Sequence, residues 1–308
     1  MMEPLFIDRL NDRIRQLRAP VCVGIDLILD QLPGELARDA QRSGDTSEIV
    51  EAFARFGQAV LDILAPLVPV VKLQSAYFER YHADGVREYF SLVDDARDLG
   101  LLTIGDVKRG DIGSTSEAYA LGHLASINDV GEDAALASTP DAITVNPMLG
   151  MDTLEPFLDV ARMERKGLFV LLRTSNPGSA ALQDVPLADG RTWSELLADL
   201  LRPITERPEF VGNGGLSSIG AVVGATQPHT MASLRQRLPG SLFLLPGYGT
   251  QGATADMTRA AFLPGGLGAV VSASRSVLYP KSGGNDWKAN IRNAAIAMVE
   301  QVRAISGI

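Results

Sequence analysis

A cluster of charged side chains in G-D-V-K-R-G-D-I-G-S-T has the residue types needed for electrostatic catalysis. Asp106 and Lys108 end an apolar run and lie two residues apart, so on a β-strand their side chains project to the same side. Asp111 and Thr115 follow on the turn beyond. Lys72 ends a second apolar run, where its ammonium group needs an acidic partner or a ligand to offset its desolvation. We therefore predict an array of Lys72, Asp106, Lys108 and Asp111 that could stabilise charge developing in a transition state.

Eight short apolar runs alternate with longer stretches of helical spacing, a pattern typical of buried parallel strands joined by helices. The helical stretches include 48–64 and 86–97. The sequence therefore predicts the α/β class, as a single (β/α)8 TIM barrel over residues 1–308 with an N-terminal helix and a closing helix at 285–305. The predicted strands begin at Val21, Val68, Leu101, Ala142, Leu168, Ile219, Leu242 and Ala269.

Two polar tracts, 33–47 and 176–192, are predicted to be insertions, since neither is long enough for another domain. Because reactive groups of such barrels stand at the C-terminal ends of the strands, the polar residues there are candidates for a site. Asp26 ends the first run and Ser175 follows the fifth, although each could also be a cap or turn residue. Asn146 precedes a proline, as routine turn formers do, and we assign it no role.

The glycine-rich loop after the seventh run satisfies the G-x-G-x-x-G pattern of dinucleotide-binding folds at Gly247, Gly249 and Gly252. The region about 20 residues further on, A-V-V-S-A-S-R, offers no acidic residue for a ribose hydroxyl, which disfavours such a fold. Loops after strands seven and eight of a barrel often bind phosphate, and Arg275 adds a cation suited to it. We therefore predict a phosphate site formed by Gln251, Gly252 and Arg275.

Composition limits the partners and the compartment. The 308 residues include 28 basic and 37 acidic ones, a net charge of −9, so no global attraction draws the protein to nucleic acid or anionic lipid. No apolar run reaches the roughly 18 to 20 residues that span a bilayer, and charges occupy the N-terminus where a signal peptide would be apolar. The lone Cys22 excludes an intrachain disulfide and is expected to be a buried thiol. We expect a cytoplasmic protein with no nucleic-acid and no membrane partner.

Metal binding is not expected. His82, His123 and His229 lack the i, i+4 spacing of a metal site. Asp106 and Asp111 could bind Mg²⁺ in isolation, but a lysine between them supplies the cation that a metal would otherwise provide.

The charged cluster resembles the signature D-x-K-x-x-D-I-x-x-T of the orotidine 5′-monophosphate decarboxylase family. Further segments agree in kind and order: G-I-D, V-K-L-Q, T-S-N-P-G, P-G-Y-G-T-Q-G and S-R-S. The chain is similar to the longer bacterial subgroup of that family, type 2, in its length and in the segments S-A-Y-F-E-R and R-T-S-N-P-G. The resemblance implies decarboxylation of a nucleotide substrate, orotidine 5′-monophosphate, to uridine 5′-monophosphate in pyrimidine biosynthesis, with no cofactor.

The resemblance also implies roles. Lys108 would stabilise the carbanion at C6 of the pyrimidine and protonate it, while Asp106 faces the departing carboxylate. Lys72 and Asp111 would keep Lys108 protonated and oriented. Asp111 would come from the neighbouring subunit, which implies a homodimer. The substrate-binding residues would be Asp26 at the ribose or at Lys72, Ser175 at the pyrimidine edge, Gln251, Gly252 and Arg275 at the phosphate, and Thr115.

Four other interpretations remain for these residues. The charges could form only a structural ion-pair network at the rim of the barrel. A related sugar-phosphate decarboxylase would use an Asp and Lys pair with Mg²⁺ on an enediolate. The combination of Lys72, Lys108, Asp111 and Ser175 argues against this enzyme. A Schiff-base aldolase needs a neutral lysine, which neighbouring carboxylates disfavour. A catalytically silent phosphate-binding barrel would need only the Arg275 loop.

Overall fold

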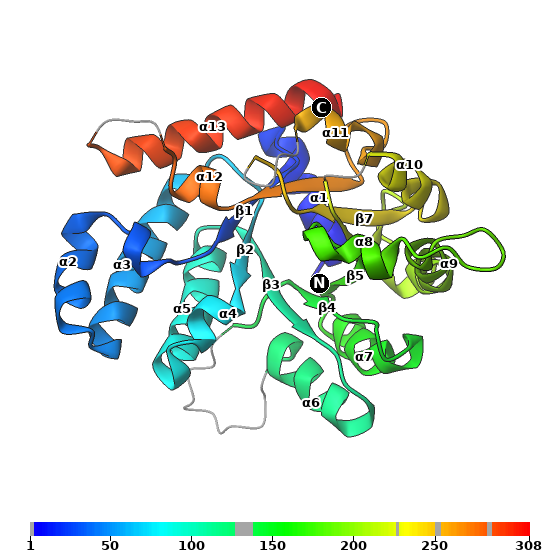
Figure 1. Ribbon diagram of the computed structural model, residues 1–308, viewed down its shortest axis with the longest axis horizontal. Coiled ribbons are helices and arrows are strands. Elements are labelled where there is room, and N and C mark those ends of the chain that lie inside the picture. The colour runs from blue at the N-terminus through cyan, green and yellow to red at the C-terminus, as the bar shows by residue number, and fades with distance from the viewer. Residues whose placement is uncertain (1–2, 127–137, 226–227, 250–253, 282–284) are drawn as a thin grey trace.

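The computed structural model describes residues 3–126, 138–225, 228–249, 254–281 and 285–308. Eight parallel strands form a closed barrel in sequence order, in which β8 pairs with β1 (Figure 1). This arrangement confirms the predicted single (β/α)8 barrel, and each predicted run begins within two residues of a strand. The strands are β1 (Val21–Ile25), β2 (Val70–Gln74), β3 (Leu102–Arg109), β4 (Ala142–Val145), β5 (Gly167–Arg173), β6 (Ser217–Val223), β7 (Ser241–Leu245) and β8 (Ala269–Ala273).

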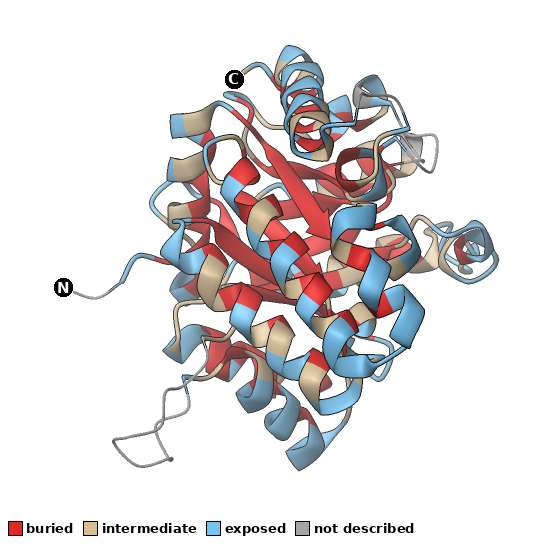
Figure 2. Ribbon diagram, turned by 90° about the vertical axis from the view of Figure 1, so that its left-hand side faces the viewer, coloured by how far each residue is buried: buried red, intermediate tan, exposed pale blue. Residues whose placement is uncertain are grey.

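Helices surround the barrel, and their buried residues face the strands, as Figure 2 shows. The predicted helical stretches correspond to α3, α5 and the closing helix α13. The helices are α1 (Phe6–Leu17), α2 (Gly34–Ser43), α3 (Thr46–Leu64), α4 (Ser75–Glu79), α5 (His82–Asp98), α6 (Gly113–Leu124), α7 (Glu155–Met163), α8 (Ala180–Gln183), α9 (Trp193–Thr205), α10 (Pro228–Arg237), α11 (Ala255–Thr258), α12 (Arg275–Leu278) and α13 (Trp287–Ser306). Short 3₁₀ helices span Leu29–Gln31, Met151–Leu154, Pro177–Ser179, Pro208–Phe210 and Arg259–Ala261.

Helix α1 packs against the N-terminal ends of the strands. Its side chains Phe6, Leu10 and Ile14 are fully buried in one apolar cluster with residues of the barrel interior. Phe6 meets Phe169 of β5 edge to face, with ring centroids 6.1 Å apart. The apolar side of α1 therefore fills the end of the barrel opposite to the predicted site.

Both tracts that the sequence predicts as insertions contain helical turns. In 33–47, α2 buries Ala37 and Ala40 and packs on α3. In 176–192, the 3₁₀ turn and α8 are followed by an antiparallel bridge between Pro186 and Thr192. Neither tract adds a strand to the barrel or forms a separate domain.

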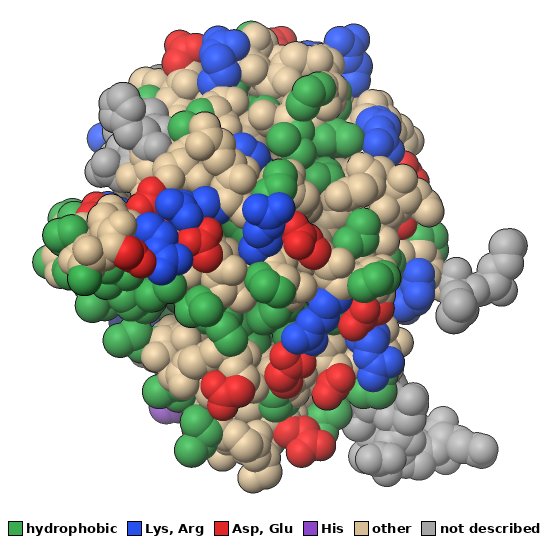
Figure 3. Space-filling model, turned by 90° about the vertical axis from the view of Figure 1, so that its right-hand side faces the viewer, with side chains coloured by type: hydrophobic (Ala, Val, Ile, Leu, Met, Phe, Trp, Pro, Cys, Tyr) green, Lys and Arg blue, Asp and Glu red, His purple; other side chains and the backbone are tan. Residues whose placement is uncertain are grey.

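The surface mixes charges of both signs. On the side that carries α9, Figure 3 shows acidic and basic side chains interspersed, in keeping with ion pairs such as Arg202 with Glu206 and Arg207 with Glu155. In the described part of the chain, no helix has both the length and the apolar character needed to cross a membrane.

Candidate active site

A cavity of about 420 Å³ lies at the C-terminal ends of the strands. The structure brings six of the predicted site residues to its wall: Asp26, Lys72, Asp106, Lys108, Ser175 and Arg275. They come from β2 and β3, from the segments that follow β1 and β5, and from the start of α12 (Arg275–Leu278) after β8. These elements are far apart in the sequence, and the closed barrel brings their C-terminal ends around one cavity. This is the end of the barrel where the sequence predicts the site.

The carboxylate of Asp106 accepts four hydrogen bonds. Its Oδ2 accepts one from Lys72 Nζ at 2.7 Å and one from Gln74 Nε2 at 3.0 Å. Its Oδ1 accepts one from Lys108 Nζ at 2.5 Å and one from Thr144 Oγ1 at 2.9 Å. Each oxygen therefore uses both of its lone pairs, so the carboxylate is fixed in orientation and has no lone pair left for a metal ion.

The charges of this cluster support one another. Burial alone would raise the pKa of Asp106, but the ammonium groups of Lys72 and Lys108 outweigh it and hold that pKa well below its ordinary value. Burial alone would lower the pKa of Lys72, but Asp106 and Asp26 outweigh it and raise that pKa above its ordinary value. Asp106 and Lys72 therefore stay charged at neutral pH, and Lys72 is not a neutral nucleophile.

The two lysines differ in exposure. The side chain of Lys72 is 9% exposed, whereas that of Lys108 is 45% exposed. Since both contact the same carboxylate, Lys72 forms the base of the cluster and Lys108 is the ammonium group that a ligand in the cavity can reach. The predicted ion pairs are present, and Lys108 is also available for chemistry.

The backbone at Lys108 is irregular. Its φ is 49°, in the left-handed region, and the pairing of β3 with β4 shifts register between Gly105 and Arg109. A non-glycine residue in this conformation costs roughly 1–3 kcal/mol, which the surrounding contacts must offset. One of these contacts is a hydrogen bond from the Lys108 N–H to Thr144 Oγ1 at 2.9 Å. Asp106 and Lys108 thus meet as predicted, but at an irregular point of β3 rather than on a regular strand.

Sequence reasoning missed Gln74 and Thr144. Gln74 lies two residues after Lys72 on β2, so strand alternation could have placed the two side chains on one side. Thr144 is a polar residue inside the short apolar strand β4 and is 1% exposed, which suggests that a buried polar partner requires it. No pattern in the sequence shows that its partners belong to β3.

Two buried oxygens in the cavity wall have no hydrogen-bond partner among the described residues. They are Asp26 Oδ1, after β1, and Ser274 Oγ, after β8. Because β1 and β8 are paired, both groups belong to one sector of the mouth. Buried polar atoms are usually paired, so this sector suits a ligand that carries hydroxyl groups.

The predicted phosphate end is described in part. Arg275 begins α12 and lines the cavity with Gly247 and Tyr248 of the loop after β7. Gly247 has a φ of 102°, a left-handed conformation that favours glycine. Gln251 and Gly252 lie outside the described residues. Since the loop belongs to a closed barrel, the dinucleotide-binding alternative is wrong.

Asp111 and Thr115 are not brought to the cavity. Neither lines the wall that the described part of their own chain forms. Asp111 Oδ1 accepts a hydrogen bond from the N–H of Ile112 at 2.8 Å, and Thr115 is exposed in the first turn of α6. Their geometry within one chain therefore gives them no catalytic contact.

The remaining sequence predictions concern a turn residue, the single cysteine and metal ligands. Asn146 Oδ1 accepts a hydrogen bond from the N–H of Met148 at 3.0 Å, which confirms the turn. Cys22 is fully buried, which confirms the expected buried thiol, and burial raises the pKa of this thiol to about 12. The described residues include no group of three or more His, Cys, Asp or Glu side chains placed to hold a metal ion.

Comparison with known proteins gives one consistent result. Residues 20–281 match the sequence model of the "Orotidine 5'-phosphate decarboxylase / HUMPS family". The orotidine 5'-phosphate decarboxylase of Rhodopirellula baltica is 38% identical over 97% of this chain and 99% of its own. That of Deinococcus radiodurans is 38% identical over the whole of both chains. The solved structure of the Leishmania donovani OMP decarboxylase has a TM-score of 0.72 and 28% identity, and the match covers 99% of each chain.

Proposed function

Because this chain belongs to the orotidine 5'-phosphate decarboxylase / HUMPS family, we propose that its cavity converts orotidine 5′-monophosphate to uridine 5′-monophosphate and carbon dioxide. One observation carries the assignment of the site: a fully hydrogen-bonded Asp106 holds two ammonium groups, and that of Lys108 faces the cavity. This is a decarboxylation step of pyrimidine biosynthesis.

The reaction requires charge stabilisation at one ring carbon. When the bond from C6 to the carboxylate breaks, its electron pair stays in the ring plane, where the π system cannot delocalise it. Lys108 stabilises this pair electrostatically and then donates a proton to C6, so a C–H bond replaces the C–C bond. Lys72 and Asp106 keep Lys108 oriented throughout, because their contacts exist before substrate arrives.

Asp106 contributes a second, smaller effect. Its carboxylate lies where the substrate carboxylate must approach Lys108, and two like charges about 4 Å apart repel by roughly 4 kcal/mol at an effective dielectric constant of 20. Loss of carbon dioxide relieves this repulsion. Since ground-state destabilisation is a disputed source of catalysis, we treat it as secondary to stabilisation of the carbanion.

No metal takes part in this mechanism. The donor set supports this part of the proposal, since both oxygens of Asp106 are saturated by protein donors. We expect exhaustive chelation with EDTA to leave kcat within about twofold of its initial value, because ammonium groups occupy the positions that Mg²⁺ would need. Activity abolished by EDTA and restored by Mg²⁺ would favour the sugar-phosphate decarboxylase instead.

The rest of the nucleotide fits the wall of the cavity. Asp26, with its unpaired oxygen, accepts a hydrogen bond from a ribose hydroxyl. Ser175 contacts the pyrimidine edge, and Arg275 binds the phosphate together with Gln251 and Gly252. The phosphate is remote from C6, so its binding energy serves to close the site and exclude water.

Asp111 and Thr115 complete the site of a second subunit in this proposal. Their absence from the cavity of their own chain supports it. So do three exposed apolar side chains in the segments that follow the paired strands β3 and β4: Ile112 is 63%, Met148 57% and Leu149 56% exposed. A contact that covers these residues removes apolar surface from water. We therefore propose a homodimer in which each Asp111 reaches the partner's Lys108.

The function is tested by the ultraviolet absorbance of orotidine 5′-monophosphate with purified protein, and by identification of uridine 5′-monophosphate as product. Protein carrying Lys108→Ala and purified identically controls for a host enzyme. Nucleotide binding without conversion would instead support the silent phosphate-binding barrel. The cytoplasmic location stays a prediction, supported by the single, buried Cys22, which leaves the chain without an intrachain disulfide.

The Arg275→Ala variant tests the phosphate end. We expect kcat/KM for the phosphorylated substrate to fall by about 10²-fold, because charge-assisted hydrogen bonds are lost, and that for unphosphorylated orotidine to change by less than about twofold. Steady-state kinetics with both substrates measures this. Arg292→Ala, at an exposed position of α13, is the matched control. Equal losses on both substrates would place Arg275 away from the phosphate.

A further inference from the structure

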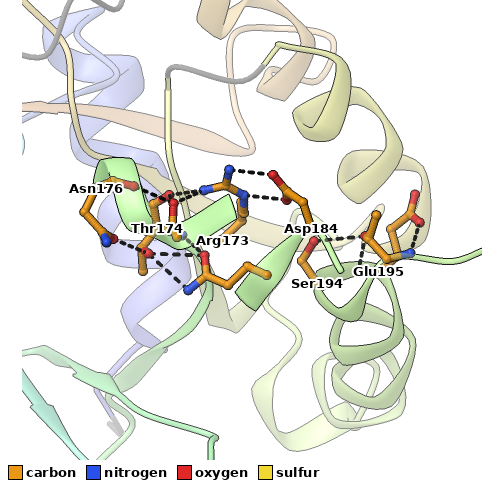
Figure 4. Close-up of polar contacts among 9 residues, drawn as sticks. Arg173, Thr174, Asn176, Asp184, Ser194 and Glu195 are labelled. Atoms are coloured by element: carbon orange, nitrogen blue, oxygen red, sulfur yellow. Dashed lines mark hydrogen bonds and ion pairs between the residues drawn. The ribbon is translucent and has the colours of Figure 1, made fainter. Parts of the chain in front are cut away.

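The segment that follows β5 is attached to the short helix α8 by two separate sets of polar contacts (Figure 4). Thr174, Ser175 and Asn176 of this segment line the cavity. Among the described residues, α8 and the rest of the 176–192 tract beyond Asn176 contribute nothing to the wall. Any influence of α8 on a ligand must therefore pass through these three residues.

The first set of contacts centres on Arg173, the last residue of β5. Its side chain is 3% exposed and forms a bidentate ion pair with Asp184, from Nε to Oδ1 and from Nη2 to Oδ2, both at 2.8 Å. Its Nη1 donates to the carbonyl of Thr174 and to Ser179 Oγ. The guanidinium thus joins the end of the strand, the first residue of the segment and the residue after α8.

The second set of contacts is made by Gln183, the last residue of α8. Its Oε1 accepts a hydrogen bond from the N–H of Thr174 at 2.8 Å. Thr174 Oγ1 in turn donates to Asn176 Oδ1 at 2.7 Å. Gln183 therefore fixes the backbone immediately before Ser175, and the bond to Asn176 fixes the residue after it.

The opposite side of the segment packs against β6. Gly224 donates its N–H to the carbonyl of Arg173 at 2.7 Å, and a Cβ at that position would lie 3.0 Å from Ser175 Cα. The segment is thus held between a glycine of the barrel and the polar contacts of α8. Any side chain at position 224 would press on Ser175, whereas a substitution in α8 can remove contacts to the segment without adding atoms there.

We propose that α8 is a positioning element for recognition of the base, with Gln183 and Asp184 acting through the Thr174–Asn176 segment to place Ser175 at the pyrimidine edge. This inference rests on the proposed function. It gives the 176–192 tract a role in ligand selection. It requires that loss of these contacts weakens binding of the base and leaves the phosphate and ribose contacts unchanged.

The test uses Gln183→Ala, because Asp184 neutralises a buried arginine whose loss of a partner would threaten folding. Binding of uridine 5′-monophosphate and of ribose 5-phosphate, which lacks the base, is measured by calorimetry. We expect the nucleotide to bind about tenfold more weakly, as loss of a partly buried hydrogen bond implies, and ribose 5-phosphate to bind within about twofold of wild type. Gln183→Glu retains the acceptor for Thr174 and should restore most of the affinity.

Two comparisons separate positioning from general stability. Gln58→Ala, at an exposed position of α3, should change neither affinity. In a Ser175→Ala background, Gln183→Ala should have less than about twofold further effect on nucleotide binding, because the two act through one contact. Equal weakening of both ligands, or full additivity with Ser175→Ala, would overturn the proposal. Failure of the proposed function would be seen separately, as wild-type protein that does not convert orotidine 5′-monophosphate.

Discussion

Replacement of Lys108 by alanine is expected to lower kcat by about 10⁴-fold or more, while the affinity for uridine 5′-monophosphate changes by less than about threefold. The variant loses both the proton donor and the cation that stabilises the carbanion. Its phosphate and ribose contacts remain. The product is the better probe of binding, since it lacks the carboxylate that Asp106 repels.

Steady-state turnover and calorimetry on the same preparation measure the two effects. Lys288→Ala, at an exposed position of α13, is the matched control and should leave both unchanged. A Lys108→Ala enzyme with near-normal turnover would remove this residue from the mechanism. Loss of turnover with an equal loss of affinity would reduce its role to binding.

Mixing two inactive variants, Asp111→Ala and Lys108→Ala, is expected to regenerate activity if each subunit supplies Asp111 to its partner. A heterodimer then has one site with both defects and one intact site. Random reassortment of equal amounts makes half of the dimers heterodimers, so activity should approach about one quarter of the wild-type value.

The control for this experiment pairs Lys108→Ala with Lys72→Ala. Both lysines line the cavity of one chain, so every site of that heterodimer keeps one defect and no activity should return. Subunit exchange is demonstrated with a mass tag on one variant. Exchange without recovery in the Asp111 mixture would show that Asp111 acts within its own chain.

Strands such as β1 and β7 could be predicted because they are buried on both faces and are almost entirely apolar. The position of Lys72 and Asp106 followed, since both lie near the C-terminal ends of such runs. The left-handed backbone of Lys108 could not be predicted, because it depends on the shifted register between β3 and β4. The role of Thr144 depends on the same register, which no local pattern specifies.

The segments outside the barrel were harder to interpret for a related reason. Helix α8 has four residues, too few for a periodic pattern, and its C-terminal end is held by the contacts of Asp184 with Arg173 and of Gln183 with Thr174. Asp111 shows a different limit. Its position in the sequence, close to Asp106 and Lys108, suggests a catalytic residue, but in the structure of one chain it does not line the cavity. Only the resemblance to a family suggested that it acts in the site of a neighbouring subunit.

The apolar end of the barrel closed by α1 bears on the fate of the carbon dioxide. Phe6, Leu10 and Ile14 pack into the interior together with Val70 and Ile104, so the described part of the barrel offers the gas no passage away from the mouth. Under the proposed reaction, carbon dioxide therefore leaves past the bound nucleotide. Until it does, it can recombine with the carbanion, and this internal return competes with proton transfer. Net turnover then depends on the proton reaching C6 before the carbon dioxide recombines. A short distance between the Lys108 ammonium group and C6 therefore raises the rate of proton transfer as well as stabilising the carbanion.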